Sequence, residues 1–446
     1  MKKITLLAVC LFAYNAYSQE YFSAITTSKR VGILNGHMNP SEFANLNSKF
    51  EVQLFNFSIN TSNNKVGFSD LTAGEDIESL IFDGKSNVNF DINAALFGPS
   101  FAMKQGKWGF GISTKAFIKA SIIDLDPDLG NALINDELDS AAGIASILSS
   151  DNQRINATTW GEMGFSVARN VYETEKHRIN AGITLKLLFP GSYANMGLDN
   201  FTGDITQDAN GLQLSNANST LNIAYSGSFG SNFGEASDYF SSLFGGLKGM
   251  ATDIGVDYQW LNENKKHKLK AGMSIRNIGS MKFSGSDNVS ENYNLNIPAG
   301  QSLNLEQFNN SDGFDDIRAV LDNSGFFTST SISDEIKVKL PTVFNFYADY
   351  QILQKVSITA FLQQKMGDQN ENGQISTQNM FTITPRATFG PFEAFLPIGN
   401  NEISGGTVGI GFRLGGFFLG SNSIISAVTS DSKQADAYFG FRFGFL

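Results

Sequence analysis

The nine residues that end the chain, YFGFRFGFL at positions 438–446, decide its fold class. Phenylalanine occupies every second position from 439 to 445, and glycine or arginine fills the positions between. Successive side chains of a β-strand point to opposite faces, so this segment has one aromatic face and one small or basic face. A free edge strand with such an aromatic face would aggregate. We therefore expect this segment to be the closing strand of a β-barrel, and barrels of the outer-membrane type typically end on such a strand.

The same alternation recurs in segments of about ten residues, the length with which a tilted strand crosses a bilayer. It is clear at 178–187, 268–276 and 408–414, where apolar residues alternate with Lys, Arg, Thr, Ser, Asn or Gly. A soluble β-sandwich also alternates, but it would not place Lys, Arg and Gly so regularly on one face of so many strands. The pattern predicts an all-β fold, an antiparallel transmembrane β-barrel.

The composition supports this class. The 446 residues include 44 Gly and 39 Phe but only 3 His and 1 Cys, and aromatic residues form girdles at the membrane interfaces of such barrels. No long apolar run follows residue 18, so no transmembrane helix is expected. The net charge is −11 and no linear basic cluster is present, which argues against a nucleic-acid partner.

The first 18 residues have the pattern of a secretory signal peptide. Lys2 and Lys3 precede an apolar stretch at 4–12, and the small residues at 16 and 18 predict cleavage between Ser18 and Gln19. Export by this route leads us to expect an integral protein of the bacterial outer membrane.

Cys10, the single cysteine of the sequence, lies inside this signal. Lipid attachment at Cys10 is the alternative, and it is disfavoured because Val9 is too large for the residue before such a cleavage. Cleavage after Ser18 removes the only thiol, so the mature chain can form neither a disulfide nor a thiolate metal site.

Strand counting predicts fourteen strands, and single-chain bacterial barrels have even numbers. The strands are expected at 49–61, 87–104, 107–119, 155–170, 177–189, 250–261, 267–283, 336–350, 355–367, 377–389, 392–398, 405–414, 417–428 and 435–446. This count places six short turns on the periplasmic side. The connections 62–86, 120–154, 190–249, 284–335, 368–376, 399–404 and 429–434 fall on the outer side.

Two features of the outer connections are ambiguous. Residues 219–230 also have strand character, and we place them within the loop 190–249 because one extra strand would break the parity. Apolar residues recur at helical spacing within 129–148, within 239–247 and, more weakly, within 317–321, which predicts long, partly helical extracellular loops. These helices either pack over the barrel mouth or form a lid.

A short motif precedes the first strand: Val31 to Met38, then Asn39-Pro40-Ser41, then Phe43-Ala44-Asn45. Here the chain resembles the barrel family of long-chain fatty-acid transporters. The resemblance is to the divergent branch of Bacteroidota outer membranes, which includes proteins of unknown function and the barrel subunits of the type IX secretion system. Ser41 stands where family members usually have Ala. The resemblance implies three parts: the signal peptide 1–18, a plug-like segment 19–48 inside the lumen, and the barrel 49–446.

The polar faces of the predicted strands are basic. Eleven Lys and Arg side chains are expected on the non-lipid face, namely Lys115, Lys119, Lys186, Lys270, Arg276, Lys337, Lys339, Lys365, Arg386, Arg413 and Arg442. Few acids share that face, and Glu162 and Asp349 are the clearest. The bases are expected to pair with loop or plug acids such as Glu20 and Glu42. The sharper hypothesis is an anionic or carboxylate-bearing ligand in the lumen, where burial strengthens the attraction.

Metal binding and catalysis have weak support in the sequence. Asp368, Asn370 and Asn372 match the first half of a calcium loop, but position twelve is Asn379 instead of Glu, and Asx and Gly residues also suit a turn. His37, His177 and His267 are isolated, and no catalytic motif is present. A hydrolase assembled from distant strands stays open as an alternative. We expect no enzyme activity and no cofactor.

Two functional hypotheses follow. The first is passive uptake or binding of a hydrophobic or amphiphilic small molecule, motivated by the family resemblance and the plug-like segment. The alternative is a structural or adaptor barrel that docks secreted or surface proteins, motivated by the long loops at 190–249 and 284–335. Outer-membrane lipid is an expected partner in both hypotheses.

Overall fold

The computed structural model describes residues 22–74, 76–138, 143–226, 246–262, 267–309 and 311–445. The predicted signal peptide with its cleavage site at Ser18 and Gln19 lies outside these residues, as does most of the predicted helix at 239–247. Both remain predictions.

The strands form a closed antiparallel ring, and the prediction of a fourteen-stranded barrel is confirmed. The ring runs in chain order through β1 (Phe50–Asn63), β2 (Val88–Phe97) with β3 (Ser100–Gln105), β4 (Trp108–Leu125), β6 (Gln153–Glu173), β7 (His177–Asp208), β9 (Gly249–Leu261), β10 (His267–Ser284), β14 (Glu335–Lys339) with β15 (Val343–Leu353), β16 (Val356–Lys365), β17 (Met380–Phe389), β18 (Phe392–Phe395) with β19 (Ile398–Asn401), β20 (Gly405–Val408) with β21 (Ile410–Leu414), β22 (Phe417–Ser421) and β23 (Gln434–Phe445). The aromatic last strand β23 pairs with β1, from Phe50 opposite Phe445 to Ser62 opposite Gln434, and so closes the ring.

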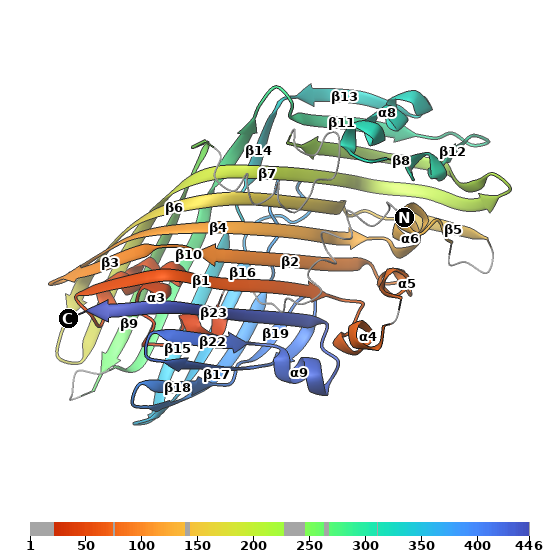
Figure 1. Cartoon of the computed structure of the whole chain (residues 1–446). Coiled ribbons are helices and arrows are strands. Elements are labelled where there is room, and N and C mark those ends of the chain that lie inside the picture. The colour runs from red at the N-terminus through yellow and green to blue at the C-terminus, as the bar shows by residue number, and fades with distance from the viewer. Residues whose placement is uncertain are drawn as a thin grey trace.

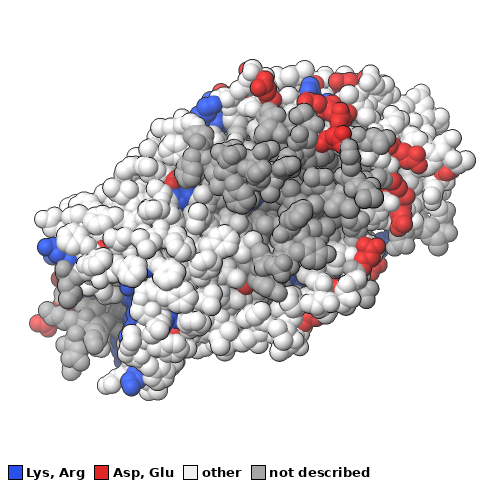
Figure 2. Space-filling model, viewed as in Figure 1, with Lys and Arg blue, Asp and Glu red and all other residues white. Residues whose placement is uncertain are grey.

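The two faces of each strand differ as the alternation predicts. On β7, Ile183 is 50% exposed on the outside, whereas Thr184 is only 5% exposed on the inside. In Figure 2 the acidic side chains gather toward one end of the molecule. None of the helices in the described part of the chain is long and apolar enough to cross a membrane.

The wall is much taller on one side than on the other (Figure 1). Strand β7 has 32 residues, which at about 3.3 Å per residue is far more than an apolar band about 25 Å tall requires. Beyond the membrane it is joined by β5 (Ile144–Leu148), β8 (Gly211–Tyr225), β11 (Val289–Asn296), β12 (Ser302–Asn304) and β13 (Phe327–Ser333). We call this outer sheet the tall wall.

The tall wall contains strands where the sequence predicted outer loops. Residues 190–208 continue β7 and residues 211–225 form β8, so this part of the expected loop 190–249 is strand. The helix expected across 129–148 ends early, because α6 (Pro127–Ile134) is followed by strand β5. The helix near 317–321 is confirmed as α8 (Phe314–Ser324).

The helices at the barrel mouth have clear local causes. Helix α6 begins where the Asp126 side chain accepts hydrogen bonds from the next main-chain N–H groups, and with η3 (Leu305–Phe308) and α8 it packs on the tall wall. The strand expected at 417–428 ends at Ser421, because buried Asp436 accepts main-chain hydrogen bonds from Asn422 and Ser423 and turns the chain into α9 (Ile424–Thr429). Two short helices, α4 (Phe68–Ala73) and α5 (Ile77–Phe82), join β1 to β2.

Candidate functional site

The N-terminal segment, residues 22–48, lies inside the ring. It contains α2 (Ser23–Thr26), α3 (Ile33–Met38) and the short helix η1 (Pro40–Asn45), nearly all of it buried. Its contacts extend around the wall: Asn39 donates to the Val256 carbonyl of β9 at 3.0 Å, and Ser274 of β10 donates to the Met38 carbonyl at 2.8 Å. Arg386 of β17 donates to the Ala24 carbonyl.

Glycine residues of the wall allow the N-terminal segment to pack closely against the strands. A Cβ atom at Gly109 would lie 2.0 Å from the Phe43 carbonyl oxygen, and one at Gly182 would lie 2.5 Å from the Pro40 carbonyl carbon. The inward glycines of the alternating strands thus provide the space in which η1 packs against the wall.

Buried ion pairs fix the same segment. Glu42 binds Lys270 of β10 at 2.5 Å and accepts a hydrogen bond from the Tyr347 hydroxyl. Glu51 of β1 pairs with Arg442 at 2.8 Å and accepts the Ile33 main-chain N–H at 2.8 Å. Glu42 is the partner that the sequence suggested; the other suggested partner, Glu20, lies outside the described residues.

Five of the eleven expected basic side chains, namely Lys115, Lys186, Arg386, Arg413 and Arg442, are paired with acids of the wall itself. Lys115 lies 3.0 Å from Glu162, and Lys186 lies 2.8 Å from Asp253. Glu393 lies within 3.9 Å of three arginines, namely Arg30 at 3.9 Å, Arg386 at 3.5 Å and Arg413 at 3.8 Å. The sequence reasoning missed Glu51, Asp253, Asp257 and Glu393, all of which are buried. Asp253 and Asp257 alternate with Gly255 on β9, and this period-2 spacing could have revealed them.

Lys337 and Lys339 do not lie where the sequence placed them. Both are exposed on the outside of β14, and the neighbouring Ile336 and Val338 are buried inside. The irregular residues 340–342 between β14 and β15 shift the alternation by one residue. The Lys339 ammonium pairs there with the Glu371 carboxylate at 2.6 Å.

Arg276, on β10, differs from the ion-paired lumen cations described above. In the described part of the chain it has no carboxylate within 4.0 Å, and it donates one hydrogen bond, to Gln363 at 3.3 Å. Its Nε atom and the Nε2 atom of His37 are buried without a hydrogen-bond partner in that part of the chain. Both residues line a small cavity of about 20 Å³, together with Ser23, Thr26, Met38, Phe97, Phe361 and Gln363. The cavity has room for about one water molecule and combines unpaired donors with aromatic walls.

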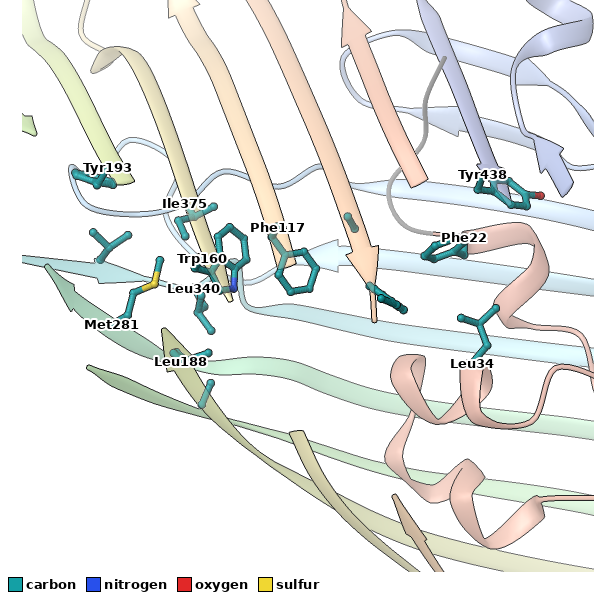
Figure 3. Close-up of a cluster of buried hydrophobic side chains, with 14 of the residues drawn as sticks. Phe22, Leu34, Phe117, Trp160, Leu188, Tyr193, Met281, Leu340, Ile375 and Tyr438 are labelled. Atoms are coloured by element: carbon teal, nitrogen blue, oxygen red, sulfur yellow. The ribbon is translucent and has the colours of Figure 1, made fainter. Parts of the chain in front are cut away.

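An apolar cluster fills the lumen next to this cavity (Figure 3). It joins Phe22 and Leu34 of the N-terminal segment to inward side chains of the wall, including Phe97, Phe117, Trp160, Leu188, Met281, Val338 and Leu340. The rings of Phe117 and Trp160 stack at 4.7 Å. The interior of an outer-membrane barrel is ordinarily polar, so this lumen cluster is a distinctive feature of the chain.

The connection between β16 and β17 was expected at 368–376 on the outer side, but residues 367–379 form it and fold into the lumen. We call it the inward loop. Gln374, Ile375 and Ser376 are at most 4% exposed, and Ile375 belongs to the lumen cluster. Polar groups of β4, β6 and β7 bind this loop and draw it inward across the barrel.

The calcium-like residues form part of the inward loop. Asp368 accepts the Asn370 main-chain N–H at 2.9 Å, and Asn372 accepts hydrogen bonds from Asn152 at 3.0 Å and Asn195 at 3.2 Å. The side-chain oxygens of Asp368 and Asn372 therefore stabilise a turn and attach it to the wall. No cluster of three or more His, Cys, Asp or Glu suited to a metal occurs among the described residues.

The closed ring, its apolar belt and its charged, partly apolar interior define an outer-membrane β-barrel. The chain belongs to DUF5723, a family of unknown function whose model matches residues 43–422. No curated protein matches the sequence.

Several solved structures are similar to this chain. They include the toluene transporter TodX of P. putida (7% identity, TM-score 0.42, covering 91% of this chain and 92% of TodX) and the monoaromatic hydrocarbon channel CymD (8%, 0.43, covering 96% and 98%). A FadL homologue of Pseudomonas aeruginosa is also similar (10%, 0.31, covering 96% and 98%).

Proposed function

We propose that this barrel takes up or binds a hydrophobic or amphiphilic small molecule inside its lumen. The lumen cluster carries this proposal. Burying apolar side chains inside the wall gives an apolar solute a surface that a water-filled pore lacks, at roughly 25 cal/mol per Å² of apolar area removed from water. The N-terminal segment would act as the plug below that cluster, since its residues Phe22 and Leu34 are part of it.

The position of Arg276 supports an amphiphile with an anionic head. Its guanidinium and the apolar side chains of Phe97 and Phe361 line the same cavity. An anion bound there would satisfy the buried Nε donor, and a hydrogen bond to a charged group contributes about 1.5–3 kcal/mol. The apolar tail would extend into the lumen cluster.

The alternative, a barrel that docks secreted or surface proteins, would use the tall wall. One face of that sheet is already covered by α6, η3 and α8 of the same chain, and Arg318 of α8 pairs with Glu291 of β11 at 2.7 Å. The relation to type IX secretion barrels stays a prediction.

A matched pair of variants tests the proposal. Val338→Asn places a polar amide in the lumen cluster, whereas Lys337→Asn changes the adjacent residue on the outside. We expect the first to weaken binding of a spin-labelled fatty acid, followed by quenching of Trp fluorescence, by at least about tenfold, and the second to leave it unchanged. Equal binding by both variants would overturn the proposal.

A second comparison tests the head group. Arg276→Gln should weaken binding of a fatty acid at least about tenfold but leave the alcohol of the same chain length unaffected, because only the acid carries charge. Equal losses for the two ligands would contradict a role for Arg276 in head-group recognition.

A further inference from the structure

The inward loop crosses the lumen between opposite parts of the ring. It leaves from β16 and returns to β17, and on the way it forms main-chain hydrogen bonds with β14: Lys339 N–H donates to the Gly373 carbonyl at 2.7 Å and Ile375 N–H to the Lys339 carbonyl at 3.1 Å. Its far side reaches β4, where Ser121 and Ser376 share a hydrogen bond. The loop therefore spans the opening of the barrel.

Two buried cations of the wall hold the far side of the loop by its main chain. Arg154 of β6 is fully buried and donates to the carbonyls of Gln369 at 2.6 Å and Gln374 at 2.9 Å. Asn195 orients this guanidinium by accepting from Nε at 3.1 Å and Nη2 at 3.0 Å. Lys119 of β4 donates to the Ser376 carbonyl at 3.0 Å.

The loop separates two different environments. On one side Ile375 packs in the lumen cluster, beside Trp160 and Leu340 in Figure 3. On the other side Gln369, Ser376 and Thr377 line a cavity of about 250 Å³, whose other walls include Asn89, Asp124, Lys365 and Glu402. One loop thus divides the apolar lumen cluster from a larger cavity with both polar and apolar walls.

We propose that the inward loop is a gate at the outer side of the barrel and that Arg154 is its latch. Every bond from Arg154 to the loop goes to a main-chain carbonyl, so departure of the loop breaks hydrogen bonds of Arg154 but no ion pair of Arg154. Detachment would join the outer cavity to the lumen cluster. The kind of solute that passes the gate rests on the proposed function, but the existence of the gate does not.

A cysteine reporter below the loop tests the gate in the full chain. Ala251 is a buried member of the lumen cluster on β9, and Ala251→Cys is a small change. With Cys10 replaced by Ser, the rate at which a small charged methanethiosulfonate reagent modifies this cysteine from outside measures how often the gate is open. Adding Arg154→Met should raise that rate at least about tenfold.

Controls make the result specific. Ser331→Cys on exposed β13 should react equally fast with and without Arg154→Met. Arg154→Lys, which keeps the charge but has a smaller set of donors, should give an intermediate rate. If Arg154→Met leaves the Ala251→Cys rate unchanged in a barrel that still shows heat-modifiable migration, the loop is not a gate.

A disulfide provides a second measurement that does not depend on the Arg154 variant. Ser121→Cys with Ser376→Cys should lock the loop onto β4 when oxidised and silence ion-conducting openings in a planar bilayer, and reduction should restore them. The control pair, Ser166→Cys with Thr184→Cys, joins β6 to β7, where the two hydroxyls lie 2.8 Å apart, and should have no such effect. Identical conductance of the oxidised and reduced loop pair would overturn the gate. Both readouts use reagents or ions, so a failure to bind hydrophobic ligands would leave them intact.

Discussion

The N-terminal segment and the inward loop lie inside the same barrel but are held there by different chemistry. The buried ion pair of the first comes from its own side chain, Glu42 on Lys270, and its Asn39 side chain binds the main chain of β9. The two buried cations that bind the second, Arg154 and Lys119 of the wall, bind its main-chain carbonyls. Side chains that fix a segment can be recognised in its own sequence. Main-chain carbonyls that fix a segment cannot, because every residue supplies a carbonyl.

The strongest test of this difference removes the ion pair under the N-terminal segment. Glu42→Gln leaves Lys270 charged and buried without its partner, which is expected to cost about 3–5 kcal/mol in docking of the segment. Limited proteolysis of residues 22–48 in the folded barrel measures that loss. Glu335→Gln, in a pair with Lys282 where both side chains are about half exposed, should cost only about 0–1 kcal/mol. Similar costs for the two variants would show that the segment is not held by Glu42.

The comparison also depends on which face of β7 points inward. Ile183→Arg places a charge in lipid near the membrane midplane and should cost about 2–4 kcal/mol of barrel stability. Thr184→Arg, on the lumen face, should be far milder. Urea-dependent folding into lipid vesicles gives both values, and equal losses would mean that our assignment of faces is wrong.

The glycines under the N-terminal segment provide a smaller effect. Gly182→Ala forces the Pro40 main chain to move, which is expected to cost about 1–3 kcal/mol and to raise the resting conductance of the barrel. Gly406→Ala, where a Cβ atom would meet nothing within 4 Å, is the control and should leave the conductance unchanged. No rise with Gly182→Ala would indicate that the segment does not limit the flow of ions.

The smallest expected effect concerns the inward loop. Gly373 and Gly390 both have positive φ, +79° and +58°, so an alanine is strained at either position. A Cβ atom at Gly373 would also lie 2.8 Å from the Lys337 carbonyl oxygen, whereas one at Gly390 would meet nothing within 4 Å. Gly373→Ala should therefore destabilise the barrel by about 1 kcal/mol more than Gly390→Ala in urea. A reversed order would contradict the position of the loop.

The ring itself was predictable because alternation is a local property of each strand. Its fourteen strands and the closing strand YFGFRFGFL follow from period-2 patterns that lipid enforces on every outward residue. Beyond the membrane this constraint disappears. The alternation at Ile336 and Val338 therefore misled the prediction, and so did the length of β7, whose outer part packs against α6 and η3.

The candidate site was only partly predictable. The basic lumen residues and Glu42 follow from alternation and from the motif before the first strand. The pairing of Lys186 with Asp253 and the separate position of Arg276 depend on which strands become neighbours, and no local pattern reports that. The inward course of residues 367–379 depends on Arg154, which lies more than two hundred residues earlier in the chain.

The pairing of β1 with β23 also sets an order of events during biogenesis. Hairpins such as β6–β7 join neighbouring parts of the chain and can form early, whereas Phe50 meets Phe445 only after almost the whole chain has arrived. Bringing such distant residues together has the largest loop-closure entropy cost of any contact in the wall. Until β1 and β23 pair, the incomplete wall has two open strand edges, and the aromatic strand β23 forms one of them. The pairing of β1 with β23 is therefore expected to be the last step in the assembly of the wall.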